Sequence, residues 1–176
     1  MNSWPGKTSS LIATSSTGAT YLRWQAGGAP MGGLCSIWRA GLATIWMGSP
    51  CQVFAESMKV QIGDDTLLYP DVFVTCDKAD LATDMIFRSP SLVIEVLSPS
   101  TQACKRSQKF ALYRRLASLQ EYVLVDPETR RIEGFRRNAD DQWVLFDMSQ
   151  DEAMACASIA CSVPLLQVFD GMDPAD

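Results

Sequence analysis

One apolar run, residues 91–97 (SLVIEVL), constrains the fold of this chain more than any other feature. A near-continuous series of valine, isoleucine and leucine is typical of a strand buried on both faces in the centre of a sheet. The next four residues (SPST) favour a helix start, because serine and threonine cap helices and proline suits the first helical turn. Residues 102–117 carry apolar side chains at helical spacing, so we expect a helix there.

Strands are expected on both sides of that helix. The pattern of apolar and β-branched residues indicates strands over 52–62, 70–76, 121–126, 131–137 and 142–147, and a closing strand with a short apolar segment over 155–169. Turn residues occupy 63–65 and 138–141, and 77–90 is expected to be a polar loop. The order of strands, one main crossover helix and further strands predicts a mixed α/β (α+β) sheet.

The acidic residues are distributed unevenly along the chain. All 20 lie at or after Glu56, so the first 55 residues carry a net charge of +3 and the remainder −8, within a total of −5. That total excludes a generally basic protein that coats nucleic acid. We therefore divide the chain into an atypical segment (1–48), which we expect to be poorly ordered, one domain (49–170) and a polar tail (171–176).

The cysteine and histidine content limits the chemistry. The six cysteines include no CxxC pair, and the absence of histidine excludes histidine-based triads and the common zinc sites. No secretory signal is visible, so we expect free thiols in a cytoplasmic protein rather than three disulfides. The apolar stretch 31–48 is interrupted by Arg39 and four glycines, so we expect no membrane span.

Glu95 is the charged residue within the apolar run. A carboxylate inside a buried strand is costly unless it is paired, hydrogen-bonded or bound to a cation. Alternation along the strand places Val93, Glu95 and Leu97 on one face. An edge position or a salt bridge to a flanking arginine would also account for Glu95, so this residue alone does not identify a site.

Two further groups could complete a site around Glu95. Asp71 begins the preceding predicted strand, and carboxylates from adjacent strands can converge on one hard cation such as Mg²⁺. It is also explained as a residue at the entry of a strand after Pro70. The predicted helix carries Lys105 and Lys109, four residues apart on one face, where a lysine can hold a phosphate or polarise water. Taken alone, these lysines are better explained by a solvated basic helix face.

Together these residues resemble a known family. The motifs are Pro70-Asp71, then EVLSPST from Glu95, then KFALYRRLASLQEYVLVDPE from Lys109. They resemble the Uma-two family of the PD-(D/E)XK nuclease-like superfamily, which is classed with restriction endonucleases, over about residues 50–170. The resemblance implies a restriction-endonuclease-like core and metal-dependent hydrolysis of DNA phosphodiester bonds, in which the metal lowers the pKa of a bound water.

The resemblance also implies roles for individual residues. Asp71 and Glu95 would bind the metal, Mg²⁺ or Mn²⁺, and Lys109 would position water or phosphate. The superfamily places its lysine two residues after the glutamate, where this chain has Leu97, so Lys109 would be a relocated equivalent. The family tends to have an aspartate where this chain has Lys105, whose effect stays open. Tyr113 and Asp126 match recurrent family positions and are interpreted as structural support.

The first 48 residues do not match the family pattern, which has a hairpin with an Ala-Met-Ala-Gly stretch and a histidine soon after. Reading residues 22–27 from the third base of each codon can spell Ala-Met-Ala-Gly, and the Pro30–Met31 junction can encode histidine. We therefore hypothesise that about 18–47 is translated out of frame. The alternative is a divergent N-terminus. The coding DNA decides between them, because a shifted frame that cannot spell these residues rules the hypothesis out.

The sequence thus favours a metal-dependent endonuclease with DNA as its partner. A catalytically inactive relic of the nuclease fold, or a DNA-binding module, is the alternative, and a structural domain without nucleic acid is less favoured because basic residues crowd 102–117. The DNA target, the cut pattern and the oligomeric state, including a homodimer, stay open.

Overall fold

The computed structural model describes residues 50–55, 58–83, 85–98 and 104–170, together with two short strands nearer the N-terminus. The strands are β1 (Ala13–Thr14), β2 (Thr20–Leu22), β3 (Gln52–Ala55), β4 (Lys59–Ile62), β5 (Thr66–Leu68), β6 (Val72–Thr75), β7 (Ile86–Phe87), β8 (Pro90–Val96), β9 (Glu121–Asp126), β10 (Arg131–Arg137), β11 (Trp143–Asp147), β12 (Ala153–Cys156) and β13 (Cys161–Pro164). The helical segments are η1 (Asp80–Ala82), η2 (Cys104–Lys109), α2 (Phe110–Tyr113), η3 (Ala157–Ile159) and α3 (Leu165–Val168).

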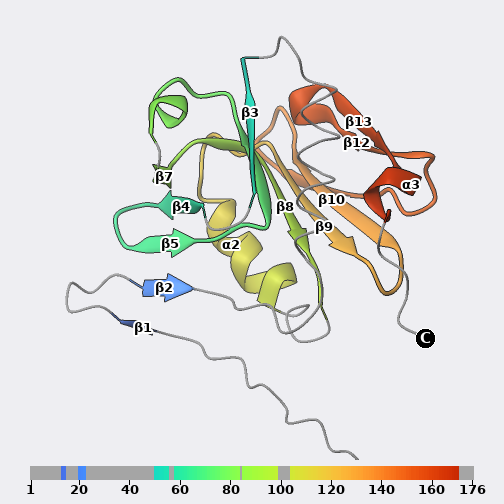
Figure 1. Cartoon of the computed structure of the whole chain (residues 1–176), viewed down its shortest axis with the longest axis horizontal. Helices are drawn as coiled ribbons and strands as arrows, with labels where there is room; N and C mark the ends of the chain where they lie inside the picture. Colours follow the sequence, from blue (N-terminus) through green and yellow to red (C-terminus); the bar gives the residue numbers. More distant parts are fainter. Residues whose placement is uncertain are drawn as a thin grey trace, which may run out of the picture.

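A six-stranded mixed sheet in the order β11-β10-β9-β8-β6-β3 forms the centre of the molecule (Figure 1). Strands β8 and β9 are parallel, and the other neighbours in this sheet are antiparallel. A parallel pair requires a crossover connection. Here η2 and α2 supply it, so the predicted mixed sheet with one main crossover helix is confirmed.

Strand β8 separates two hydrophobic cores, as its alternating side chains predict. Val93 and Leu97 belong to the core that also contains Tyr113 from α2. Leu92 and Ile94 belong to the opposite core, which β12, β13 and α3 close. Figure 1 shows α2 near one end of β8, with the hairpin β12–β13 and α3 on the other side of the sheet. Both faces of β8 are therefore dry, which makes the position of Glu95 in this strand costly.

A second, smaller sheet has the order β1-β2-β5-β4-β7. Its hairpin β4–β5 turns at residues 63–65, as predicted. Gly63 has a φ of +61°, a left-handed conformation that glycine adopts without steric cost. Buried residues from β4, β5 and β7 join the core beneath α2. The second sheet therefore covers the face of the central sheet that carries Glu95.

Three predicted elements differ from the structure. The strand expected over 52–62 is two strands, β3 and β4, which lie in different sheets. The helix expected over 102–117 is described as a π-helical segment, η2, followed by one turn of α-helix, α2, and residues 114–115 and 117–118 form turns. The loop expected over 77–90 contains η1 and β7 and ends with the first residue of β8. Each difference is set by packing between segments, which local periodicity does not report.

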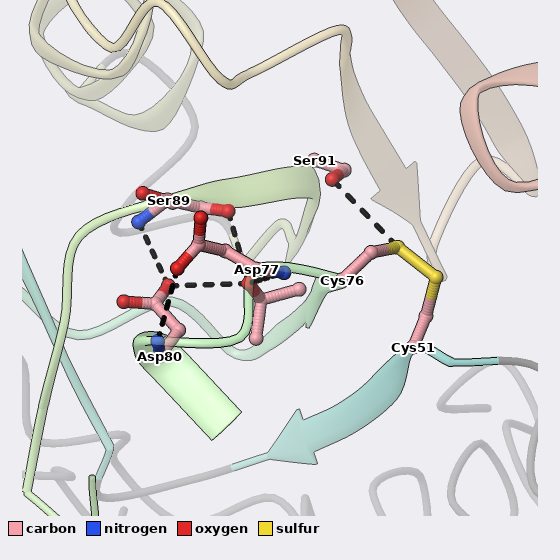
Figure 2. Close-up of a disulfide and its surroundings, with 7 residues drawn as sticks. Cys51, Cys76, Asp77, Asp80, Ser89 and Ser91 are labelled. Carbon is pink, nitrogen blue, oxygen red and sulfur yellow. Dashed lines mark hydrogen bonds between the residues drawn. A yellow bond between two sulfur atoms is a disulfide. The ribbon is translucent and has the colours of Figure 1, made fainter. Parts of the chain in front are cut away.

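The prediction that the cysteines are free thiols is wrong for one pair. Cys51, just before β3, and Cys76, just after β6, form a disulfide, which Figure 2 shows. The cause is the register of β3 and β6: Gln52 pairs with Thr75, so the next positions outward, Cys51 and Cys76, face each other. Cys156 and Cys161 are free and buried.

The loop after Cys76 is held by Asp80, which is 4% exposed. Its carboxylate accepts hydrogen bonds from the backbone N–H groups of Arg88 and Ser89, both at 2.8 Å, and from the Thr75 hydroxyl at 3.1 Å. Figure 2 shows Asp80 between the start of η1 and Ser89. These bonds satisfy the buried carboxylate and fasten the loop to the entry of β8.

Several predictions fall on residues that the structure does not describe. The expected poor order of 1–48, the frame hypothesis for 18–47, the absence of a membrane span over 31–48 and the tail 171–176 concern residues outside the described part of the chain, apart from β1 and β2. Strand β2 pairs in parallel with β5. Within the described part of the chain, no helix is long and apolar enough to cross a membrane.

Candidate active site

Glu95 lies in the middle of the central sheet with no exposed surface. Its strand must continue through the sheet, so alternation forces its side chain into the core beneath α2. There its two carboxylate oxygens, Oε1 and Oε2, accept hydrogen bonds from Lys109 Nζ at 2.7 Å and 3.0 Å. The predicted partnership of Glu95 with a basic group is present, and the partner is a lysine from the crossover rather than a flanking arginine.

Lys109 is the last residue of η2 and directly precedes α2. It is 4% exposed, and its Nζ also donates to the backbone carbonyl of Tyr69 at 3.3 Å. An ammonium group has three protons to donate. Its bonds therefore join the chain just before Asp71 to the glutamate of β8, and the basic helix face expected to be solvated is, at this residue, buried.

Asp71 is half-buried and stands one residue before β6. Strands β6 and β8 are antiparallel with Val72 opposite Ile94, so one step along the register brings Asp71 beside Glu95. Asp71 Oδ2 accepts a hydrogen bond from the backbone N–H of Val96 at 2.7 Å. The structure thus brings the three predicted site residues, Asp71, Glu95 and Lys109, to one place at the end of β8.

Tyr113 lies one helical turn after Lys109, on the same face, and is fully buried. Its hydroxyl is 3.5 Å from Glu95 Oε1, at the outer limit of a hydrogen bond. Burial raises the pKa of Tyr113 well above its ordinary value of 10.0, and the nearby charge of Glu95 raises it further. Tyr113 is therefore neutral and faces Glu95, and its interpretation as structural support stays a prediction.

Two other positions from the sequence do not contribute to the site. Asp126 accepts hydrogen bonds from the backbone N–H groups of Glu128 and Thr129 at 3.1 Å and 3.3 Å, so it stabilises the turn after β9. Leu97 is buried in the apolar core beneath α2. The side chain of Lys105 lies outside the described residues.

Glu121 is a buried carboxylate that the sequence analysis did not single out, although it begins an apolar strand much as Glu95 interrupts one. It has no exposed surface. Its carboxylate accepts bonds from Arg136 Nε at 2.7 Å and from the backbone N–H and the hydroxyl of Ser158 at 3.1 Å and 2.9 Å. These contacts tie β9 to β10 and η3, so Glu121 has a structural role.

The donors near Glu95 suit a hard cation. They are the carboxylates of Glu95 and Asp71 and the carbonyl of Tyr69, and Mg²⁺ prefers such oxygens and keeps several waters. Among the described residues, no group of three or more histidine, cysteine, aspartate or glutamate side chains gathers that could hold a metal. The site therefore offers two carboxylates, and Lys109 already bonds both oxygens of one of them.

Comparison with known proteins points to one family. Residues 38–163 match the model of the Uma2 family, whose description is "Putative restriction endonuclease". The match begins within the segment 1–48 and contains Asp71, Glu95 and Lys109.

Two relatives are uncharacterized proteins of Synechocystis, slr1290 and sll1609. The chain is 33% identical to the first over 126 residues, which are 71% of this chain and 66% of the relative. It is 33% identical to the second over 105 residues, which are 58% of this chain and 59% of the relative. The matches thus span about three fifths to two thirds of the length of these relatives.

A solved structure from Anabaena variabilis, described as "a putative nuclease belonging to DUF820", has a similar fold. The TM-score is 0.62 at 17% identity, and the match covers 81% of this chain and 79% of the other. This similarity supports the restriction-endonuclease-like fold.

Proposed function

The chain belongs to the Uma2 family, and on that premise we propose that it is a metal-dependent nuclease that hydrolyses phosphodiester bonds in DNA. The observation that carries the proposal is the convergence of Glu95, Lys109 and Asp71 at the end of β8. Two carboxylates beside one lysine are the groups that phosphodiester hydrolysis needs for a cation and for the charge on phosphate. The expected cytoplasmic location stays a prediction.

In this proposal Glu95 and Asp71 would hold Mg²⁺ or Mn²⁺ through carboxylate oxygens. The metal, when bound, supplies a polarised water and neutralises charge on the phosphoryl oxygens. The Val96 N–H fixes the Asp71 carboxylate through Oδ2, which orients it before any ligand arrives. Such preorganisation reduces the cost of assembling the site.

Lys109 has a second role available to it. Its ammonium donates to both carboxylate oxygens of Glu95. If the ammonium turns away from one of them, that oxygen becomes available to bind a cation. The released N–H groups can then donate to a phosphate oxygen or to the attacking water. Lys109 therefore balances the charge of Glu95 in the buried site and supplies donors to the substrate.

The alternative is a nuclease fold that has lost its chemistry. One observation favours it: Lys109 is 4% exposed and contacts both oxygens of Glu95, which is also what a purely structural buried ion pair looks like. Such a protein would bind DNA without cutting it, or would not bind it at all.

Cleavage of supercoiled plasmid and of single-stranded and double-stranded oligonucleotides, with Mg²⁺, Mn²⁺ or EDTA, tests the proposal. We expect cleavage with metal and none with EDTA, and a loss of about 100-fold or more in Glu95→Gln and Asp71→Asn. Glu121→Gln is the matched control, because it neutralises another buried carboxylate away from the site. If both site variants cleave DNA as fast as wild type does, the metal-site assignment is wrong.

Binding without cleavage, in every metal tested, would favour the alternative. A mobility-shift measurement separates the two forms of that alternative by whether DNA is bound at all. Where it is bound, a steep loss of binding as salt rises identifies contacts to DNA phosphates.

A further inference from the structure

Tyr113 carries a polar hydroxyl group into an apolar core. It is the last residue of α2, it has no exposed surface, and it packs in the same core as Phe73, Leu116 and Leu119. A phenylalanine would fill nearly the same space without the free-energy cost of burying a polar group. A buried hydroxyl is tolerated where it is hydrogen-bonded, so its partner indicates its role.

The partner of this hydroxyl is the site glutamate. Within the described part of the chain, the Tyr113 hydroxyl has one hydrogen-bond partner, Glu95 Oε1, at 3.5 Å. Burial raises the pKa of Tyr113 most, and the charges of Glu95 and Asp71 are among the causes that raise it further. The hydroxyl therefore lies in the field of both carboxylates and keeps its proton, which it can donate to a carboxylate oxygen.

Glu95 Oε1 thus accepts from two donors of different kinds. Lys109 Nζ, at 2.7 Å, is positively charged and stands at the end of a flexible chain. Tyr113 is neutral, and its ring is held by packing, with the centre of the Tyr122 ring 5.6 Å away. A cation beside Glu95 repels an ammonium group far more than a neutral phenol. Of the two donors, the lysine can therefore turn away while the tyrosine stays.

The ion pair alone does not account for the tyrosine. Lys109 already balances the charge of Glu95 and donates to both of its carboxylate oxygens. Tyr113 follows Lys109 by four residues, so both side chains project from the same face of the crossover toward Glu95. The glutamate thus has a second donor, which it does not need for charge balance while the lysine is in place.

Resting on the proposed nuclease function, we propose that Tyr113 is a positioning residue for the metal-binding carboxylate. Its hydroxyl holds Oε1 of Glu95 in one orientation, both while Lys109 bonds the carboxylate and after the ammonium has turned toward a phosphate or a water. Removal of a group that orients a metal ligand in this way commonly lowers metal affinity or activity by about 10- to 100-fold.

Binding of Mn²⁺ to the full chain without DNA, measured by isothermal titration calorimetry, tests the proposal. We expect the dissociation constant to rise at least about 10-fold in Tyr113→Phe, because Glu95 loses the donor that fixes its orientation. Tyr122→Phe is the matched control: it removes a hydroxyl from the neighbouring buried ring and should bind Mn²⁺ as wild type does.

Two further measurements make the result interpretable. The circular dichroism spectrum and thermal midpoint of each variant report on folding, and we expect Tyr113→Phe to keep the wild-type spectrum. Glu95→Gln shows whether the Mn²⁺ that is measured occupies this site, because it should abolish the binding. A purely structural Tyr113 would lower the thermal midpoint in Tyr113→Phe and leave the dissociation constant unchanged.

Three results would overturn the proposal. The first is a wild-type dissociation constant in Tyr113→Phe, whether or not the thermal midpoint falls. The second is equal weakening in Tyr113→Phe and Tyr122→Phe, since the effect would then not depend on the contact with Glu95. The third is that wild type and Glu95→Gln bind Mn²⁺ equally or not at all. That last result alone also contradicts the proposed metal-dependent function, so the two failures are distinguishable.

Discussion

Lys109 Nζ lies 2.7 Å from Oε1 and 3.0 Å from Oε2 of Glu95, and both side chains are buried. The pair joins the crossover segment to the central strand, and it makes burial of the glutamate tolerable. Any catalytic use of Glu95 must therefore begin from a carboxylate that is already bonded.

Removal of the lysine should leave an uncompensated buried charge. We expect Lys109→Met to lower the free energy of unfolding by about 3 kcal/mol in urea denaturation at neutral pH. Combining Lys109→Met with Glu95→Gln should recover part of that loss, because no buried charge is then unpaired. Lys78→Met, at an exposed turn position, is the control and should change stability by less than about 0.5 kcal/mol. Additive losses in the double variant would contradict the pairing.

Tyr113 should make stability fall at high pH. Burial and Glu95 raise the pKa of Tyr113 in the folded chain above its ordinary 10.0, so the unfolded chain loses this proton first as pH rises. The stabilisation from a neutral Tyr113 is complete below pH 10 and declines as pH rises above it. Urea unfolding of wild type and Tyr113→Phe from pH 8 to 11 measures this. An identical decline in both proteins would exclude Tyr113 as its source.

Loss of the disulfide should destabilise the domain. The bond between Cys51 and Cys76 closes a loop with a sequence separation of 25 residues, and such a constraint is worth about 3 kcal/mol through the entropy of the unfolded chain. We expect Cys51→Ala with Cys76→Ala to lower the thermal midpoint, and dithiothreitol to lower that of wild type equally. If dithiothreitol lowers the midpoint of the double variant as well, the effect has another cause.

Cys156 and Cys161 should be unreactive in the folded protein. Burial is the main cause that raises the pKa of both thiols above the ordinary 9.0, and only the thiolate reacts. In a background that carries Cys35→Ser and Cys104→Ser, a disulfide-exchange reagent at pH 8 should modify these thiols at least about ten-fold faster after denaturation in urea. Rapid modification of the native protein would show that this hairpin opens readily.

The strongest local patterns in the sequence predicted the core of the fold. The apolar run around Glu95 is β8, its alternation separates the two cores, and the crossover after it leads to the parallel strand β9. These features succeeded because burial on both faces imposes a composition that a single sequence displays. The turn at residues 63–65 was visible for a different reason: Gly63 is a turn residue that supplies the backbone conformation the turn needs.

Features that depend on contacts between distant segments were not predictable. The division of 52–62 between two sheets and the pairing of Cys51 with Cys76 both follow from the register of β3 with β6, which local periodicity does not contain. The π-helical geometry before Lys109 is likewise absent from helix propensities. Glu121 could have been found, because a carboxylate at the start of an apolar strand raises the same question as Glu95.

The site residues also divide into those that a local sequence pattern reveals and one that depends on contacts between distant segments. Glu95 was visible as a charge in an apolar strand, and Asp71 as a second carboxylate near it. Lys109 needed the family resemblance, since a basic helix face is ordinarily solvated, whereas here its Nζ also reaches the carbonyl of Tyr69.

The short sequence separations within the site bear on the order of folding. Lys109 and Glu95 are 14 residues apart, and Asp71 and Val96 are 25 apart, so these contacts close small loops. Loop closure of this length costs little entropy, which favours early formation. We expect Lys109→Met to slow refolding in stopped-flow measurements, and Val163→Ala in β13 mainly to accelerate unfolding. The contacts among Asp71, Glu95 and Lys109 would then belong to a folding nucleus to which the C-terminal strands are added.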